Sequence, residues 1–159
     1  MANLNQGVRG FYQLTEAIKT ELLQDVSINT VTTGDITDVN LNKQDMFPLG
    51  HIIINNVIDN ENTLDFNITV LACDIVDQSK NQTVDRFVGN NDVQDILNTQ
   101  LAVLNRLIQR LRKGTLYTEM YQLNGSPSIT PFYDRFENQL AGWSATMDIQ
   151  IYNDIYICP

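Results

Sequence analysis

The single histidine, His51, is the first side chain to consider for acid–base chemistry. It is followed by the apolar residues Ile52–Ile54, which predicts that it begins a strand and does not lie in a polar cleft. One histidine and two distant cysteines, Cys73 and Cys158, cannot supply the four ligands of a standard zinc site. The chain also has no glycine-rich phosphate loop and no Gly-x-Ser-x-Gly elbow. The sequence therefore predicts no enzymatic activity, no metal site and no cofactor.

Carboxylates occur in three sets that could be functional. A calcium loop needs ligands at alternating positions and a glutamate at its end, and the first set lacks this pattern. An acid–base pair needs surroundings that shift a pKa, and nothing in the sequence indicates them for the other two sets. All three are weak signals: Asp35, Asp38 and Asp45; Asp74 and Asp77; Asp134 and Glu137.

Four of the ten basic residues lie within eight positions, at Arg106, Arg110, Arg112 and Lys113. They fit a solvated helix face whose cations stabilise the helix C-terminus. They also fit a contact between this patch and the acidic middle of a neighbouring subunit, which would favour head-to-tail association into rings. The sequence leaves both interpretations open. The predicted subunit interface joins the patch to an extended arm: Asp77, Lys80, Arg86, Phe87, Arg106, Arg110, Arg112 and Lys113.

Two amphipathic helices are predicted to position these groups. The first covers about residues 8–24, where apolar side chains recur at helical spacing. The second covers about residues 92–113, where eight aliphatic side chains fall within an arc of about 140° at 100° per residue. The two stripes are Phe11, Leu14, Ile18 and Leu22, and then Val93, Ile96, Leu97, Leu101, Leu104, Leu107, Ile108 and Leu111.

Strands are predicted between the two helices. Ile28–Thr33 and Gly50–Val57 are apolar runs flanked by turn residues. Leu64–Ala72 alternates between apolar and polar residues, which predicts a long, half-buried strand. The turn residues Asp59–Asn62 precede it, so we expect it to form a hairpin with the strand before.

Further strands are predicted after the second helix. Gly125–Pro127 and Pro131 are interpreted as breaks that delimit short segments at residues 120–123 and 128–129. A final strand is predicted where apolar and polar residues alternate from Trp143 to Ile151.

The order of these elements predicts an α+β fold, with a mostly antiparallel sheet packed on one face by two main helices. We expect one domain over residues 1–159. Its strands lie within residues 27–76 and 115–157, and a polar arm covers residues 77–91.

The charge balance limits the partners of this domain. Nineteen acidic and ten basic residues give a net charge of −9, which opposes non-specific binding to nucleic acid or to an anionic membrane. Eleven of the acids lie between Asp35 and Asp95. No secretory signal and no run of about 18 apolar residues occurs, so we expect a soluble protein made in a reducing cytoplasm.

Together, several segments resemble the bacteriophage tail terminator, or tail-completion, family of the lambda minor tail protein U type. The resemblance extends over residues 11–152 and rests on the order of the elements. Its segments are the N-terminal helix, the hairpin ending in Leu71–Lys80, the polar arm, the helix containing Val93–Leu107 and the closing strand Leu140–Tyr152.

The resemblance implies a structural virion protein that forms a ring, commonly of six copies, at the head-proximal end of a phage tail. Its partners would be copies of itself, the tail tube protein and neck or portal-proximal proteins. DNA would pass through the ring without specific binding, and no membrane would be involved. The protein would lie in the virion tail or neck, and in the host cytoplasm during assembly.

Other interpretations remain open. The first alternative is a connector ring of the neck, as a portal adaptor or head-completion protein. The second is a small cytoplasmic ligand-binding α+β domain, which would need a pocket of convergent polar groups. The apolar stretch Tyr152–Pro159 departs from the family, and we interpret it as an additional strand or a docking peptide.

Overall fold

The computed structural model describes residues 9–35, 46–76, 92–113, 121–135 and 140–153. Both predicted helices and a single sheet are found within these ranges. The elements are α1 (Arg9–Leu23), β1 (Thr30–Thr33), β2 (Leu49–Asp59), β3 (Thr63–Ile75), α2 (Val93–Lys113), β4 (Gln122–Arg135) and β5 (Leu140–Tyr152). The predicted arm over residues 77–91 lies outside the described residues.

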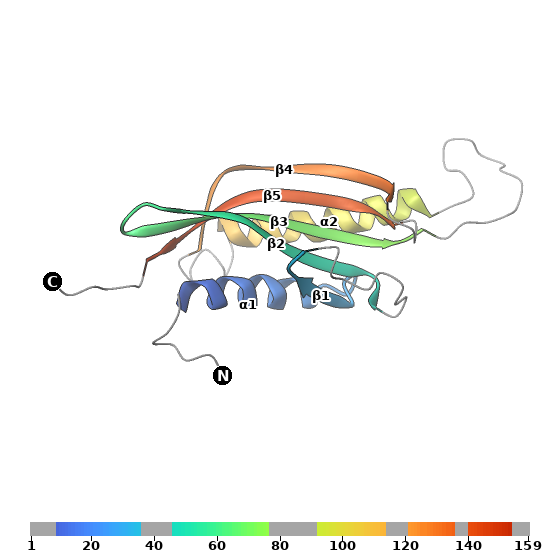
Figure 1. Ribbon diagram of the computed structural model, residues 1–159. Helices are drawn as coiled ribbons and strands as arrows, with labels where there is room; N and C mark the ends of the chain where they lie inside the picture. The colour runs from blue at the N-terminus through green and yellow to red at the C-terminus, as the bar shows by residue number, and fades with distance from the viewer. Residues whose placement is uncertain (1–8, 36–45, 77–91, 114–120, 136–139, 154–159) are drawn as a thin grey trace, which may run out of the picture.

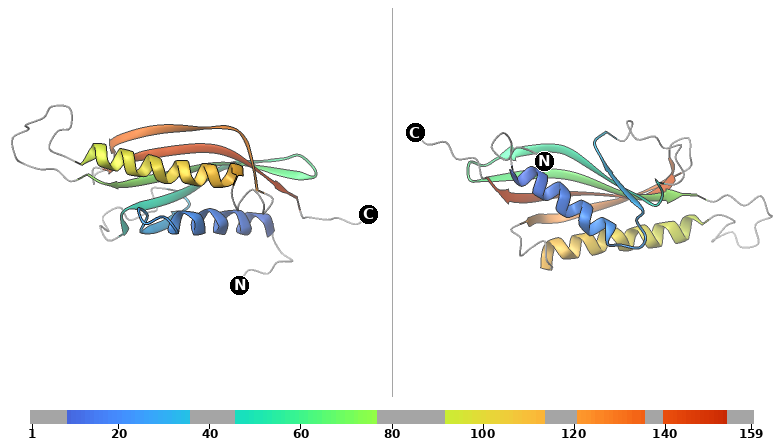
Figure 2. Two further views of the ribbon diagram at one scale, coloured as in Figure 1. Left: turned by 180° about the vertical axis from the view of Figure 1, so that it is seen from behind. Right: turned by 90° about the horizontal axis from the view of Figure 1, so that it is seen from below.

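The five strands form one sheet in the order β1-β2-β3-β5-β4. β1 runs parallel to β2, and every other neighbouring pair is antiparallel. β5 lies between β3 and β4. After β3 the chain therefore passes through α2 to the edge position of β4, and β5 then fills the position between β4 and β3. Both helices lie on the same face of the sheet, as Figures 1 and 2 show. The predicted α+β fold with a mostly antiparallel sheet is confirmed.

The core fills the space between this face and the two helices. Alternate side chains of β3 from Leu64 to Ala72 point toward the helices and are buried. Their cross-strand partners on β5 include Met147 and Ile149, which are also buried. α1 contributes Leu14 and its two neighbours along the helix, Ile18 and Leu22. The buried side chains of the strands recur at every second residue, and those of α1 recur at helical spacing. Together they pack in one apolar layer.

The buried face of α2 differs slightly from the predicted stripe. Leu101 is 37% exposed, whereas Gln100 and Val103 are buried. The positions around Gln100 that face the sheet are apolar, so this amide lies within the buried arc. Its Nε2 donates to the carbonyl oxygen of Ser27 at 3.4 Å, and its Oε1 is buried without a partner among the described residues. Trp143 Nε1 donates to the carbonyl oxygen of Leu97 at 2.7 Å and ties β5 to the same helix.

The prediction of two short segments around residue 125 was wrong. β4 is one continuous strand, in which Asn124 pairs with Asp148 and Ser128 pairs with Thr146. The residues between them form an irregularity that includes Gly125 at φ +66°. β4 is at the edge of the sheet, where a proline needs no ladder partner on its outer side, so the prolines do not end the strand.

Candidate interaction surfaces

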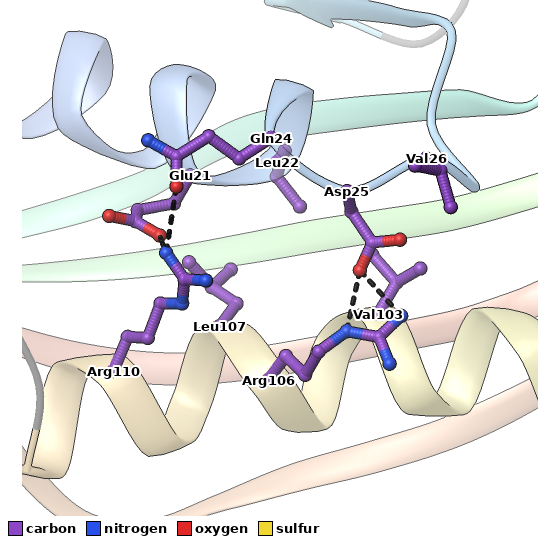
Figure 3. Close-up of a pocket in the computed structure, with 9 residues that line it drawn as sticks. All are labelled: Glu21, Leu22, Gln24, Asp25, Val26, Val103, Arg106, Leu107 and Arg110. Atoms are coloured by element: carbon purple, nitrogen blue, oxygen red, sulfur yellow. Dashed lines mark hydrogen bonds and ion pairs between the residues drawn. The ribbon is translucent and has the colours of Figure 1, made fainter.

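The basic cluster of α2 makes ion pairs inside the chain (Figure 3). Arg106 Nη2 lies 2.6 Å from Asp25 Oδ2, and its Nε donates to the same oxygen at 2.7 Å. Arg110 Nη1 pairs with Glu21 and also donates to Gln24 Oε1 at 2.8 Å. The two carboxylate side chains are only 9% exposed, whereas the two arginine side chains are about half exposed. These contacts hold the C-terminal end of α1 against α2.

The other members of the predicted interface are not part of this network. Arg112 and Lys113 are exposed at the end of α2, and neither forms an ion pair with a residue that the structure describes. Both side chains are exposed, so we expect their charges to be available to a partner. The remaining predicted interface residues lie outside the described residues: Asp77, Lys80, Arg86 and Phe87.

The ion pairs line a cleft of about 290 Å³ between the end of α1 and α2. The cleft has apolar walls that include Val103 and Leu107. Two arginines face two carboxylates, so the charges in the cleft balance. Glu21 and Asp25 are four residues apart and so are Arg106 and Arg110, so each pair lies along one side of its segment and the two pairs can meet. A ligand that bound here through charge would have to displace an existing partner.

His51 is buried and structural. Its Nε2 lies 2.9 Å from the carbonyl oxygen of Gly34, which can only accept, so Nε2 carries the proton. Its Nδ1 lies 2.6 Å from Thr32 Oγ1 and accepts from that hydroxyl. Burial lowers the pKa of His51, although the contact with Gly34 and the charge of Asp35 act in the opposite direction. The neutral ring thus ties β1 to β2 with both nitrogens engaged.

Cys73 and Asp74 are adjacent titratable groups at the end of β3. Burial raises the pKa of the Cys73 thiol to about 12, and this thiol contacts the carbonyl oxygen of Leu49 at 3.7 Å. Burial also raises the pKa of Asp74, and the charge of Asp92 adds to this effect. A thiol with a raised pKa is a poor nucleophile at neutral pH.

The three carboxylate sets predicted as weak signals remain mostly outside the described side chains. Only Asp35 and Asp74 have described side chains, and the other members do not: Asp38, Asp45, Asp77, Asp134 and Glu137. Across the described ranges, no three histidine, cysteine, aspartate or glutamate side chains gather in a way that could hold a metal ion.

A group of large apolar side chains is exposed at the end of the molecule where the β2–β3 hairpin turns. We call it the tip patch: Phe11, Tyr12 and Val57 on the helix side of the sheet, and Ile58 and Tyr152 on the opposite face, all between 36% and 64% exposed. The β2–β3 turn and the end of β5 lie at this end of the sheet, beside the start of α1 (Figure 1). The sequence placed Phe11 in the core stripe of the first helix, but it lies at the open end of that stripe.

The helix-side members of the tip patch, Phe11, Tyr12 and Val57, line an apolar groove of about 450 Å³, which we call the tip groove. The Phe11 ring packs against Phe66 with a centroid separation of 6.1 Å and against Tyr12 at 5.8 Å. Val57 and Leu64 complete the apolar lining, and Asp59 is the one carboxylate that lines it. The groove therefore offers an apolar surface and one acidic group.

The face of the sheet opposite the helices carries a network of polar side chains across three strands. Asn55 Nδ2 donates to Asn67 Oδ1 at 2.9 Å and to Thr69 Oγ1 at 2.7 Å. Asn67 Nδ2 donates in turn to Asp148 Oδ1 at 2.7 Å, and Thr69 and Thr146 hydroxyls are 3.1 Å apart. The lysine and arginine side chains that the structure describes all lie on the helices, so this face has no described cation.

At the other end of the same face, away from the hairpin turn, the side chains are apolar and buried. A second cluster of buried side chains forms there from Phe47, Leu49, Cys73, Phe132 and Leu140. The face opposite the helices is thus polar toward the tip, and apolar and buried at the opposite end.

The chain was also compared with known proteins. No protein-family model matches it, and a search of curated proteins finds no significant similarity. Neither described helix is long and apolar enough to cross a membrane.

Proposed function

We propose that the chain is a structural subunit that assembles into a ring at the head-proximal end of a phage tail. In this role it ends growth of the tail tube and joins the tail to the head, leaving a channel for DNA. The observation that carries the proposal is the tip patch, because apolar side chains that are exposed together at one end of a folded protein are typical of contacts with other proteins.

The charge distribution supports a subunit that surrounds DNA without gripping it. The net charge of −9 repels a polyanion, and the face of the sheet opposite the helices combines amides, hydroxyls and Asp148 with no described cation. The described cations gather on the helices, where Arg106 and Arg110 are already paired.

The described surfaces support the alternatives less well. A ligand-binding domain needs polar groups that converge on a pocket. In the cleft between α1 and α2 the polar groups pair with one another, and the tip groove offers only Asp59. Catalysis by His51 would require breaking a bond that holds β1 to β2. No observation favours the neck connector over the tail terminator, and ring symmetry would separate them.

The function is tested by polymerising the tail tube protein of the same phage with and without this chain. Electron microscopy should show tubes that stop growing and that carry extra density at one end. The matched variants are Val57→Asp, in the tip patch, and Val26→Asp, at a fully exposed valine elsewhere. Tubes that grow equally long with the chain present, and that carry no added density, would contradict the proposal.

A further inference from the structure

The two edges of the sheet differ in how readily a further strand can pair with them. At the β4 edge, Pro127 and Pro131 remove backbone donors, and the register is irregular at two places. Prolines and irregularities of this kind protect edges against pairing. At the other edge β1 pairs with β2 only as far as Ile52, and no described residue pairs with the outer side of β2 from Ile53 to Asp59. This seven-residue edge contains no proline and has one charged residue, Asp59.

The tip groove lies beside this part of β2, with which no described residue pairs on the outer side. Val57 lines the groove from this strand, and its side chain is 45% exposed. A strand added to an edge gains affinity from main-chain hydrogen bonds and specificity from pockets for alternate side chains. The edge and the groove together supply both features.

The chain itself contains a segment suited to this edge. Residues 154–159 follow β5 and include Ile155, Tyr156 and Ile157, which are residue types that favour strands. In an extended strand, the two isoleucines point to the same side. At about 3.3 Å per residue the six residues span about 20 Å, and the edge Ile53–Asp59 spans about 23 Å.

The starting point of this segment favours a second copy as the acceptor. Asn153 is fixed beside the β2–β3 turn, because its backbone N–H donates to the Asn62 carbonyl oxygen at 2.9 Å and its Nδ2 donates to the Glu61 carbonyl oxygen at 3.1 Å. β5 and β2 are both antiparallel to β3, so they run in the same direction with β3 between them. Ile155 is two residues beyond Asn153, too few to reverse direction and cross the three strand spacings, about 14 Å in total, between β5 and the outer side of β2.

We propose that the β2 edge from Ile53 to Asp59 accepts residues 154–159 of a second copy as an added strand, with Ile155 and Ile157 in the tip groove. The inference rests on the proposed function and specifies its subunit contact. Each copy donates one segment and accepts another, which is the head-to-tail contact that closes into rings.

Disulfide trapping in the full-length chain tests the contact. Asn56→Cys puts a thiol on the exposed edge of β2, and Cys158 is the natural thiol in the donated segment. Cys73 does not interfere, because it is buried and its pKa is raised to about 12. After mild oxidation we expect a ladder of cross-linked species on a non-reducing gel, with a 56–158 linkage identified by mass spectrometry. The ladder should be lost when Cys158→Ser is added.

Two further variants serve as matched controls. Val26→Cys carries a thiol at a fully exposed position away from the edge and should give no 26–158 linkage. Ile155→Asp combined with Ile157→Asp, in the Asn56→Cys chain, should remove the ladder without changing the far-ultraviolet circular dichroism spectrum. An unchanged ladder in this variant would contradict the seating of the isoleucines.

The outcomes separate the inference from the proposed function. A 56–158 linkage found only within single chains would overturn the second copy as occupant. No 56–158 linkage in a sample that still forms rings would overturn the inference and leave the proposed function standing. A sample that forms neither cross-links nor large species, with or without the tail tube protein, would count against both.

Discussion

The cleft between α1 and α2 and the groove at the hairpin tip are both hollows beside α1, but their interactions differ. In the cleft, Arg106 and Arg110 meet carboxylates of the same chain, and those carboxylates are nearly buried. At the tip, the apolar side chains of α1 and β2 remain exposed. Interactions completed within one chain stabilise the fold, whereas incomplete apolar surfaces leave free energy to be gained from a partner. We therefore expect the cleft to contribute to stability and the tip to the proposed assembly.

The largest effect is expected from charging the tip. Val57→Asp combined with Ile58→Asp should weaken assembly roughly a hundredfold, or about 3 kcal/mol, because two apolar side chains would be replaced by carboxylates that must be desolvated. The free energy of unfolding of the monomer should fall by no more than about 1 kcal/mol, since both positions are exposed. Sedimentation velocity and urea denaturation measure the two quantities. A loss of stability with unchanged assembly would indicate that the tip stabilises the monomer and is not the assembly surface.

The next effect is expected at Gly142, in the sheet that supports both regions. A Cβ atom there would overlap the carbonyl oxygen of Ala72 and lie 2.7 Å from the Cα atom of Cys73. These are backbone atoms of β3, so Gly142→Ala should lower the free energy of unfolding by about 3 kcal/mol. In the control Gly10→Ala, the added Cβ meets only the end of the Ile151 side chain, and the loss should be smaller. Thermal unfolding would compare the two variants, and an unchanged free energy of unfolding in Gly142→Ala would show that β3 and β5 can separate without cost.

A pH effect is expected at His51. Its pKa is lowered mainly by burial, so below the ordinary value of 6.5 the unfolded chain binds more protons than the folded chain. Stability should therefore fall as the pH falls below 6.5, by at most about 1.4 kcal/mol per pH unit for one group. The raised pKa of Asp74 acts in the opposite direction at lower pH. Urea denaturation of wild type and His51→Asn between pH 7 and pH 5.5 isolates the histidine. A variant that keeps the full slope would show that other groups cause it.

The smallest effect is expected in the cleft and at the end of α2. Arg106→Gln combined with Arg110→Gln should cost about 0.5 kcal/mol of stability per ion pair, because both guanidinium groups are partly solvated, and should leave assembly unchanged. Arg112→Gln combined with Lys113→Gln should leave stability unchanged and weaken assembly in low salt only. Urea denaturation measures the stability of both double variants, and light scattering at two salt concentrations measures their assembly. Weaker assembly in the Arg106→Gln, Arg110→Gln variant alone would indicate that the subunit interface lies at the cleft and not at the tip.

The sequence predicted the elements whose signals are local. The spacing of Leu14, Ile18 and Leu22 and the alternation along β3 each give the burial pattern directly. Pro127 was misread as a break because its tolerance depends on an edge position, which only the pairing of β4 with β5 reveals.

The candidate surfaces were less predictable. The pairing of Arg106 with Asp25 depends on how α1 packs on α2, and no local pattern fixes that geometry. The tip patch depends on where the apolar stripe of α1 meets the end of the sheet. Phe11 therefore looked like a core residue when only its spacing was considered. Gln100 was missed for a related reason, because a single polar residue among apolar positions does not alter the helical period.

The central claim is that this chain assembles through its tip, and mass photometry of the purified full-length chain over a wide concentration range tests it most directly. Negative-stain images of any large species would follow. The account predicts closed rings that are lost in the Val57→Asp, Ile58→Asp variant and kept in Val26→Asp. A chain that stays monomeric at every concentration, and that also fails to bind tail tube or portal-proximal proteins, would contradict it.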